Sequence, residues 1–191
     1  MNRLRNIRYN SPVILTFTLI SFAALILNFI TRGVSNRMIF SVYRSSPLQP
    51  LFYVRLVCHV FGHAGWSHFS GNMITLLLVG PLMEEKFGSL PTAVMMVITA
   101  LVTGLVNILL FPTGLLGASG IVFAMIMLAS ITSMKGEGIP LTFIIVAVFY
   151  FGGQIYDAVF VKDQVSNLTH IVGGLLGCGF GALMKPGRRL I

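Results

Sequence analysis

The chain has 191 residues, of which 55% are hydrophobic and only 9% are charged, and its mean hydropathy is +0.89. About a quarter of the residues in a soluble domain are charged, so this composition excludes a soluble globular protein. The net charge of +8 would suit nucleic acid, but basic residues flank the first and last apolar runs, where anchors at a membrane surface belong. We therefore expect an integral membrane protein, with the lipid bilayer and not nucleic acid as its partner.

Six apolar runs are long enough to span a membrane, since a spanning helix needs about 20 mostly apolar residues. They are residues 13–30, 66–83, 90–111, 115–134, 139–160 and 165–184. The strands of a membrane barrel would be shorter and would alternate in polarity, and these runs do not. No room is left for a separate soluble domain. We predict an all-α fold, a polytopic membrane protein whose residues 1–191 form one compact bundle of six transmembrane helices.

The first run is predicted to be a retained signal anchor, because its apolar core is long and no small-x-small cleavage site follows it. Six spans put both termini on one side of the membrane. That side carries eight of the thirteen basic residues and the other side five, so the positive-inside rule places both termini in the cytoplasm. Because the chain is compact and shows no targeting presequence, we expect the inner membrane of a bacterium.

One connection is long. Residues 31–65, between the first and second runs, contain two prolines and the apolar-aromatic sequence LFYVRLVCHVF. This composition is typical of a segment that lies in the bilayer interface. Four of the five basic residues expected outside fall in this segment, namely Arg32, Arg37, Arg44 and Arg55.

Ionisable residues inside membrane spans are costly and are candidates for function. On the predicted topology, the second, fourth and sixth helices all run inward from the outer surface. His68, Ser119 and His170 each lie a few residues into one of these helices, about 5–10 Å below its start. We therefore expect three polar side chains, far apart in the sequence, to reach one depth. Asn72 follows His68 by four residues and shares its helix face.

A stripe of glycines follows His170 along the last run, at spacings of three and four residues, and includes Gly173 and Gly177. Small residues on a stripe let a neighbouring helix approach closely. Gly117, Ala118 and Gly120 make the surroundings of Ser119 equally open. We predict a close contact of the fourth and sixth helices that brings the Ser119 hydroxyl within reach of the His170 ring. A nucleophile beside a base is the arrangement of acyl transfer.

Ser119 is predicted to lie in the first turn of its helix, where backbone N–H groups have no intrahelical partners and the helix dipole is positive. An oxyanion formed there would be stabilised by the Ser119 N–H, with side-chain donors from His68 and Asn72. The glycines beside Ser119, Gly117 among them, let the substrate backbone come close.

Four motifs in a fixed order resemble the rhomboid family of intramembrane serine proteases over nearly the whole chain. They are HAGWSHFSGNM at residues 63–73, GPLMEEKFGS at 80–89, GASGIVFA at 117–124 and THIVGG at 169–174. They resemble the family's histidine-rich start of helix 2, its glutamate-bearing turn into helix 3, its GxSG nucleophile motif and its helix 6 histidine. The chain has Thr169 where the family often has alanine, and Val54 where it often has tryptophan, and neither position is catalytic.

The resemblance implies a serine endopeptidase in which Ser119 is the nucleophile and His170 the general base, without an essential carboxylate. It implies His68 and Asn72 as oxyanion donors, and Phe123 as the aromatic residue packed against the histidine. It also implies that the substrates are transmembrane-helix proteins cut near the outer surface, with residues 31–65 embedded in the outer leaflet. No cofactor is needed for this chemistry.

The remaining candidates are predicted to support the structure. Glu84 is expected to tie down the turn between the second and third helices, and Gly173 and Gly177 to serve helix packing. His59 and His63 have the spacing of a helical metal pair, but a zinc site takes a third ligand and the sequence has no HExxH. We therefore expect no metal site.

Three other functions are alternatives. The main alternative is a proteolytically inactive rhomboid-like protein that binds membrane helices, although its usual mark is loss of the serine or the histidine. A transporter with a histidine proton relay would place its polar cluster at the bilayer midplane and show internal repeats. An intramembrane metalloprotease would need a set of metal ligands.

Overall fold

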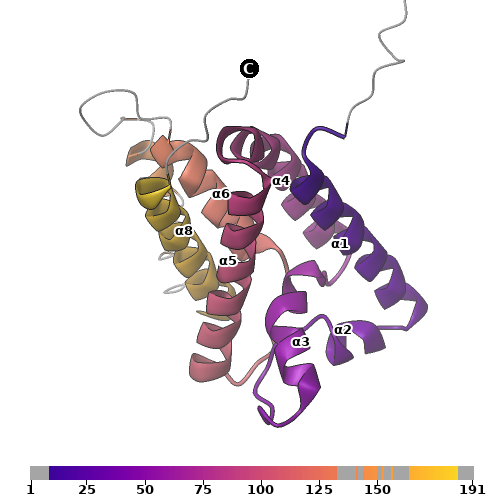
Figure 1. The fold of residues 1–191 in the computed structure, drawn as a ribbon. Coiled ribbons are helices and arrows are strands. Elements are labelled where there is room, and N and C mark those ends of the chain that lie inside the picture. Colours follow the sequence, from indigo (N-terminus) through magenta and orange to yellow (C-terminus); the bar gives the residue numbers. More distant parts are fainter. Residues whose placement is uncertain are drawn as a thin grey trace, which may run out of the picture.

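The computed structural model describes residues 9–132 and 164–184, together with 141, 144–149, 152 and 156. These residues are helical apart from loops and one isolated β-bridge. The long helices are α1 (Pro12–Ile30), α4 (Trp66–Phe87), α5 (Ser89–Leu110), α6 (Ser119–Thr132) and α8 (Gln164–Leu183). Figure 1 shows them as a bundle, with α1 beside α4 and α6 beside α8. In the described chain, α5 contacts each of the other long helices.

Two of these helices, α1 with 19 residues and α5 with 22, are long and apolar enough to cross a membrane. Helix α6 and residues 167–183 of α8 form shorter apolar helices. The expected count of six spans is therefore not confirmed, and the fifth run, residues 139–160, lies largely outside the described residues. Large apolar side chains are exposed along α4 and α5, including Leu78 at 69% and Leu109 at 69%, as expected for helices that face lipid.

The long connection between α1 and α4 is folded and contains α2 (Val34–Met38), α3 (Pro50–Cys58) and the 3-10 turn η2 (His59–Phe61). The apolar-aromatic sequence noted above accordingly forms a helix, with Pro50 in its first turn, where a missing N–H is tolerated. Figure 1 shows α2 and α3 gathered at one end of the bundle. We call residues 31–65 together with residues 111–118 the loop end.

Three polar contacts fix the loop end to the helices. Val42 and Leu115 exchange both backbone N–H···O bonds at 2.9 Å, which forms the β-bridge. The Asn107 side chain donates to the carbonyls of Val42 (3.2 Å) and Thr113 (3.0 Å). Arg44 donates to two carbonyls at the end of α5, those of Ile108 and Leu109, each at 2.7 Å. A cation there also complements the negative end of the helix dipole.

The opposite end of the bundle is tied together by Glu84, which is 4% exposed. Its carboxylate accepts the N–H groups of Val13 and Ile14, both at 3.0 Å, and the Ser89 hydroxyl at 2.7 Å. The first N–H groups of a helix lack intrahelical partners and favour negative charge. Glu84 therefore caps α1 and also binds the start of α5, whereas the sequence predicts a role only in the α4–α5 turn.

The predicted start of the fourth span is wrong. Residues 115–118 are not helical, and α6 begins at Ser119 itself. The reason is local. Leu115 is held in the β-bridge, and Gly117 has φ +126°, a backbone conformation that glycine adopts readily but that does not occur within an α-helix. The three residues also do not lie equally far into their helices, since Ser119 begins α6, His68 lies two residues past the start of α4 and His170 six past the start of α8. Their common depth in the membrane stays a prediction.

Candidate active site

Ser119 lies at the entrance of α6 and is partly exposed. It lines a small cavity that we call the Ser119 pocket, with His59, Val60, Thr103, Leu115, Gly117, Gly120 and Thr169. The N–H of Val122 donates to the Ala118 carbonyl at 2.9 Å, which begins the backbone bonding of the helix. The N–H groups before Val122 point along the helix axis without intrahelical partners. An anion at this position meets both those donors and the positive end of the helix dipole.

His68 and Asn72, both on α4, lie against the backbone of Gly117. A Cβ placed on Gly117 would come within 2.7 Å of His68 Cε1, 2.8 Å of His68 Nε2 and 3.9 Å of Asn72 Nδ2. Glycine is therefore needed at this position for two reasons, its positive φ and the space that the histidine occupies. Both side chains of α4 therefore lie against a residue that precedes Ser119 by two positions in the chain.

Asn72 is 8% exposed, and its Nδ2 has no hydrogen-bond partner among the described residues. A buried donor without an acceptor costs about 1–3 kcal/mol. The amide nitrogen nevertheless lies beside Gly117, at the edge of the Ser119 pocket. A side chain that is held at such a cost next to a cavity is a candidate for binding an oxygen atom that arrives with a substrate.

His170 is half-buried on α8, and its ring stacks on Phe123 of α6, with ring centroids 4.4 Å apart and planes 5° from parallel. Phe123 follows Ser119 by four residues and therefore lies on the same face of α6, one turn further along. The stack fixes the plane of the imidazole ring on the Ser119 side of the helix pair.

Helices α6 and α8 touch through their backbones. A Cβ on Gly173 would collide with the carbonyl group of Gly120, and a Cβ on Gly177 with that of Ala124. The Thr169 carbonyl also lies 3.7 Å from the Cβ position of Gly120. Gly120, which follows Ser119, is thus contacted by Thr169 and Gly173, which lie before and after His170 on α8. Ser119 and His170 therefore belong to one helix crossing, on facing helices.

His59 and His63 anchor the loop end and lie outside the membrane-spanning helices. The carbonyl of His59 accepts the Gly117 N–H at 3.0 Å, and the carbonyl of His63 accepts from Asn36 Nδ2 at 3.0 Å. Burial lowers the pKa of each imidazole to about 4, and for His63 the nearby His68 adds to the effect. Both rings are therefore neutral near pH 7. The His63 ring packs on His68, with centroids 5.1 Å apart, a contact that the sequence analysis missed.

Thr103 is a further residue of the Ser119 pocket that the sequence analysis missed. It is 2% exposed on α5, and its hydroxyl donates to the Thr99 carbonyl at 2.7 Å. Thr99, Thr103 and Asn107 recur at every fourth residue of a mostly apolar helix, and all three are buried. This polar stripe at helical spacing is the sequence signal that could have identified Thr103. Among the residues that the structure describes, no group of three or more His, Cys, Asp or Glu could hold a metal ion.

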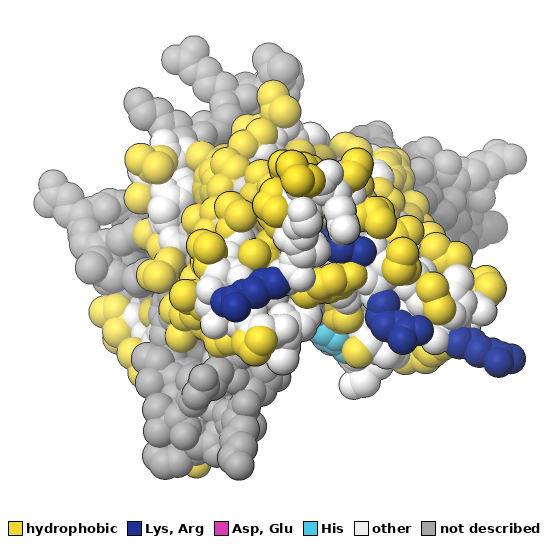
Figure 2. All heavy atoms as spheres, turned by 90° about the horizontal axis from the view of Figure 1, so that it is seen from below, with side chains coloured by type: hydrophobic (Ala, Val, Ile, Leu, Met, Phe, Trp, Pro, Cys, Tyr) yellow, Lys and Arg dark blue, Asp and Glu magenta, His cyan; other side chains and the backbone are white. Residues whose placement is uncertain are grey.

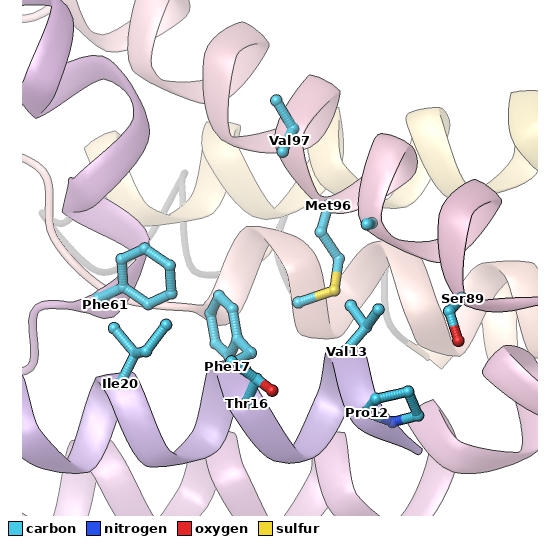
Figure 3. A pocket seen from close by; sticks show the side chains of 10 residues that line it. Pro12, Val13, Thr16, Phe17, Ile20, Phe61, Ser89, Met96 and Val97 are labelled. Atoms are coloured by element: carbon cyan, nitrogen blue, oxygen red, sulfur yellow. The ribbon is translucent and has the colours of Figure 1, made fainter. Parts of the chain in front are cut away.

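A larger cavity of about 440 Å³, which we call the α1–α5 groove, lies apart from these residues (Figure 3). It is lined by Pro12, Val13, Thr16, Phe17, Ile20, Phe61, Ser89, Ala93, Met96 and Val97. Its side-chain polar atoms are the hydroxyls of Thr16 and Ser89, and Ser89 is bonded to Glu84. The lining residues of the groove include no pair of nucleophile and base.

Comparison with known proteins gives one family. The family model described as "Rhomboid domain" matches residues 51–187, a range that contains His68, Asn72, Ser119 and His170. Rhomboid-related protein 1 of Caenorhabditis elegans is 33% identical over 140 residues, which is 66% of this chain and 38% of that protein.

Two proteins of Arabidopsis thaliana are also similar. Rhomboid-like protein 11, chloroplastic, is 26% identical over 144 residues, and RHOMBOID-like protein 5 is 28% identical over 144 residues. The matches cover 67% and 69% of this chain, and 51% and 45% of the respective relatives. The chain thus spans about half the length, or less, of the curated relatives that it matches.

Proposed function

Because the chain belongs to the rhomboid family, we propose that it is an intramembrane serine endopeptidase that cleaves transmembrane segments with a Ser119–His170 dyad. As a family member it is an integral membrane protein. The observation that carries the proposal is the crossing of α6 and α8, where Gly120, next to Ser119, is packed between Thr169 and Gly173, which flank His170.

The proposed reaction has two steps. The Ser119 hydroxyl attacks the scissile carbonyl while His170 accepts its proton, and His170 then gives that proton to the leaving amine. Water, with His170 again as the base, hydrolyses the acyl-enzyme and restores the serine. The stack on Phe123 supports this role, because it holds the imidazole in one plane through both proton transfers.

The oxyanion is proposed to bind at the start of α6. Its donors are the Ser119 N–H, the Asn72 amide and the His68 ring, which approach the backbone of Gly117 from α4. Donors placed in advance where negative charge develops lower the barrier without reorganisation during the reaction. The buried Asn72 Nδ2, which has no described partner, is available for this task.

The membrane orientation is part of the proposal. We place both termini in the cytoplasm, on the support of basic residues that flank the first and last helices in the sequence. The inner membrane of a bacterium stays the location predicted from the sequence. The loop end then faces outward, so substrate helices are cut near the outer membrane surface.

The test is covalent labelling with a fluorophosphonate probe, which reacts with activated serines. We expect the detergent-purified protein to be labelled, and Ser119→Ala and His170→Ala to lose the label. Ser130→Ala is the matched control, because Ser130 lies on the same helix with its hydroxyl bonded to the Ile126 carbonyl at 2.8 Å. Absence of label on folded, unchanged protein would favour the helix-binding alternative instead.

A further inference from the structure

The loop end carries cationic charge that no described residue neutralises. Residues 31–65 contain four arginines and no carboxylate. The described carboxylates, Glu84 and Glu85, lie at the far end of α4, about 27 Å from its first residue at 1.5 Å per residue, several times the Debye length of about 8 Å. Figure 2 views the molecule from the loop end and shows Lys and Arg side chains spread over this face, with histidine among them and no acidic side chain in view.

Two of the arginines hold backbone carbonyls of the loop end and of α5. Arg55 is 5% exposed, donates to the Met38 carbonyl at 2.9 Å and lies 4.5 Å from the centre of the Tyr43 ring. Arg44 is exposed but held by the carbonyls of Ile108 and Leu109. The negative end of the α5 dipole offsets part of the Arg44 charge, but no described carboxylate pairs with Arg44. Only two of its three guanidinium nitrogens are engaged, so donors remain in a fixed position.

Arg32 and Arg37 make no such contacts with the described residues. Both are exposed, and neither side chain has a hydrogen bond or ion pair among the described residues. Arg32 also has φ +50°, a left-handed conformation that asparagine or glycine adopts at lower cost. On the proposed orientation these cations lie outside, against the positive-inside tendency. Contacts with described residues therefore do not explain why positions 32 and 37 carry positive charge.

The cations are joined to the elements that build the Ser119 pocket. Arg44 follows by two residues Val42, whose bridge partner Leu115 lines that pocket. On the other side, Arg37 is adjacent to Asn36, which donates to the carbonyl of His63 in the turn that leads to His68. The positive charges therefore lie on segments bonded to both the α4 and the α6 sides of the site.

We propose that the exposed arginines Arg32, Arg37 and Arg44 recognise acidic side chains in the outer juxtamembrane segment of the substrate. The inference rests on the proposed function for the identity of the partner. Carboxylates are the complementary ligand, because guanidinium groups bind them through paired, charge-assisted hydrogen bonds. Asp157, Lys162 and Asp163, which precede α8, lie outside the described residues. Attachment to the walls of the pocket favours a peptide next to the scissile bond over a lipid headgroup.

Surface ion pairs are individually weak, and complementary charge acts mainly on association. We therefore expect an acidic substrate to bind about tenfold more tightly than a neutral one when three pairs contribute. The advantage appears in KM with kcat unchanged, and it disappears near 1 M salt, where the Debye length falls to about 3 Å.

The experiment uses vesicles of zwitterionic phosphatidylcholine and two transmembrane peptides that differ only in three outer juxtamembrane residues, Asp in one and Asn in the other. Binding is measured with the Ser119→Ala variant, and cleavage with the unchanged protein. We expect tighter binding of the Asp peptide at low salt. The double variant Arg32→Asn, Arg37→Gln should lose most of this preference. The charge-preserving double variant Arg32→Lys, Arg37→Lys should keep more of it, because the charge remains while the paired guanidinium bonds are lost.

Equal binding of the two peptides, or binding of neither, would overturn the inference whether or not cleavage occurs. The binding measurement is repeated in vesicles that contain anionic lipid. If the Asp peptide binds more tightly only in those vesicles, and not in phosphatidylcholine, the inference is overturned in favour of a lipid-headgroup site. Tighter binding of the Asp peptide without cleavage of either peptide would support the inference and count against the protease proposal.

Discussion

The contact between α6 and α8 differs from the contact between α1 and α5 in how closely the helices approach. At α6–α8, glycines bring one backbone against the carbonyls of the other. At α1–α5, larger side chains such as Phe17 and Met96 leave a groove of about 440 Å³. A pair of reacting groups must be held to within about 1 Å, and backbone contact gives that precision. Ser119 and His170, the catalytic candidates, lie on the two helices of the close contact.

The largest effect is expected from Gly173→Leu, which breaks the close contact. The new side chain would collide with the Gly120 backbone, which cannot move aside cheaply. We expect cleavage to fall by more than about 1,000-fold, because losing one member of a nucleophile–base pair costs up to about 10⁶-fold in kcat. Gly179→Ala is the matched control on α8, since nothing lies within 4 Å of its Cβ position. If Gly173→Leu cleaves normally, the crossing does not position the dyad.

Asn72→Ala tests the α4 side of the site. We expect kcat to fall by about 100- to 1,000-fold, the usual result of removing one oxyanion donor. Thermal stability should not fall, because the Asn72 Nδ2 has no described partner to lose. The comparison is Asn107→Ala, which loses bonds to Val42 and Thr113 and should lower the unfolding temperature. A lower unfolding temperature for Asn72→Ala with unchanged kcat would assign Asn72 to structure.

Phe123→Leu removes the ring stacked on His170 and keeps an apolar side chain. Aromatic pairs contribute about 0.5–1.5 kcal/mol beyond burial, which corresponds to about a 2- to 13-fold loss of kcat if the stack orients the base. Phe123→Tyr keeps the ring and should retain activity. Steady-state kinetics of the two variants gives the answer, and equal kcat values for both would show that the stack does not matter.

The smallest effect is expected from Ala93→Leu, which adds volume to the α1–α5 groove. The groove is apolar and open, so the larger side chain should fit without strain. We expect cleavage within about twofold of the unchanged protein and a stability that is equal or slightly higher. A large loss of activity would mean that the groove takes part in the reaction, and the comparison between the two contacts would fail.

The sequence predicted the close contact of α6 and α8 because its signal is local, a stripe of small residues at helical spacing. It did not predict where α6 begins, because the apolar run continues through Leu115 while the β-bridge with Val42 and the positive φ of Gly117 keep that segment extended. The cap that Glu84 provides to α1 was also missed, because the partners are 70 and 71 residues apart. Contacts of that range leave no periodic pattern in a single sequence.

The central claim is that Ser119 and His170 cut a peptide bond within the membrane. The most direct measurement is mass spectrometry of a transmembrane peptide incubated in vesicles with the unchanged protein, with Ser119→Ala and with His170→Ala. The account predicts two complementary fragments with the unchanged protein and none with either variant. Equal cleavage by Ser119→Ala, or cleavage that a chelator abolishes, would contradict it.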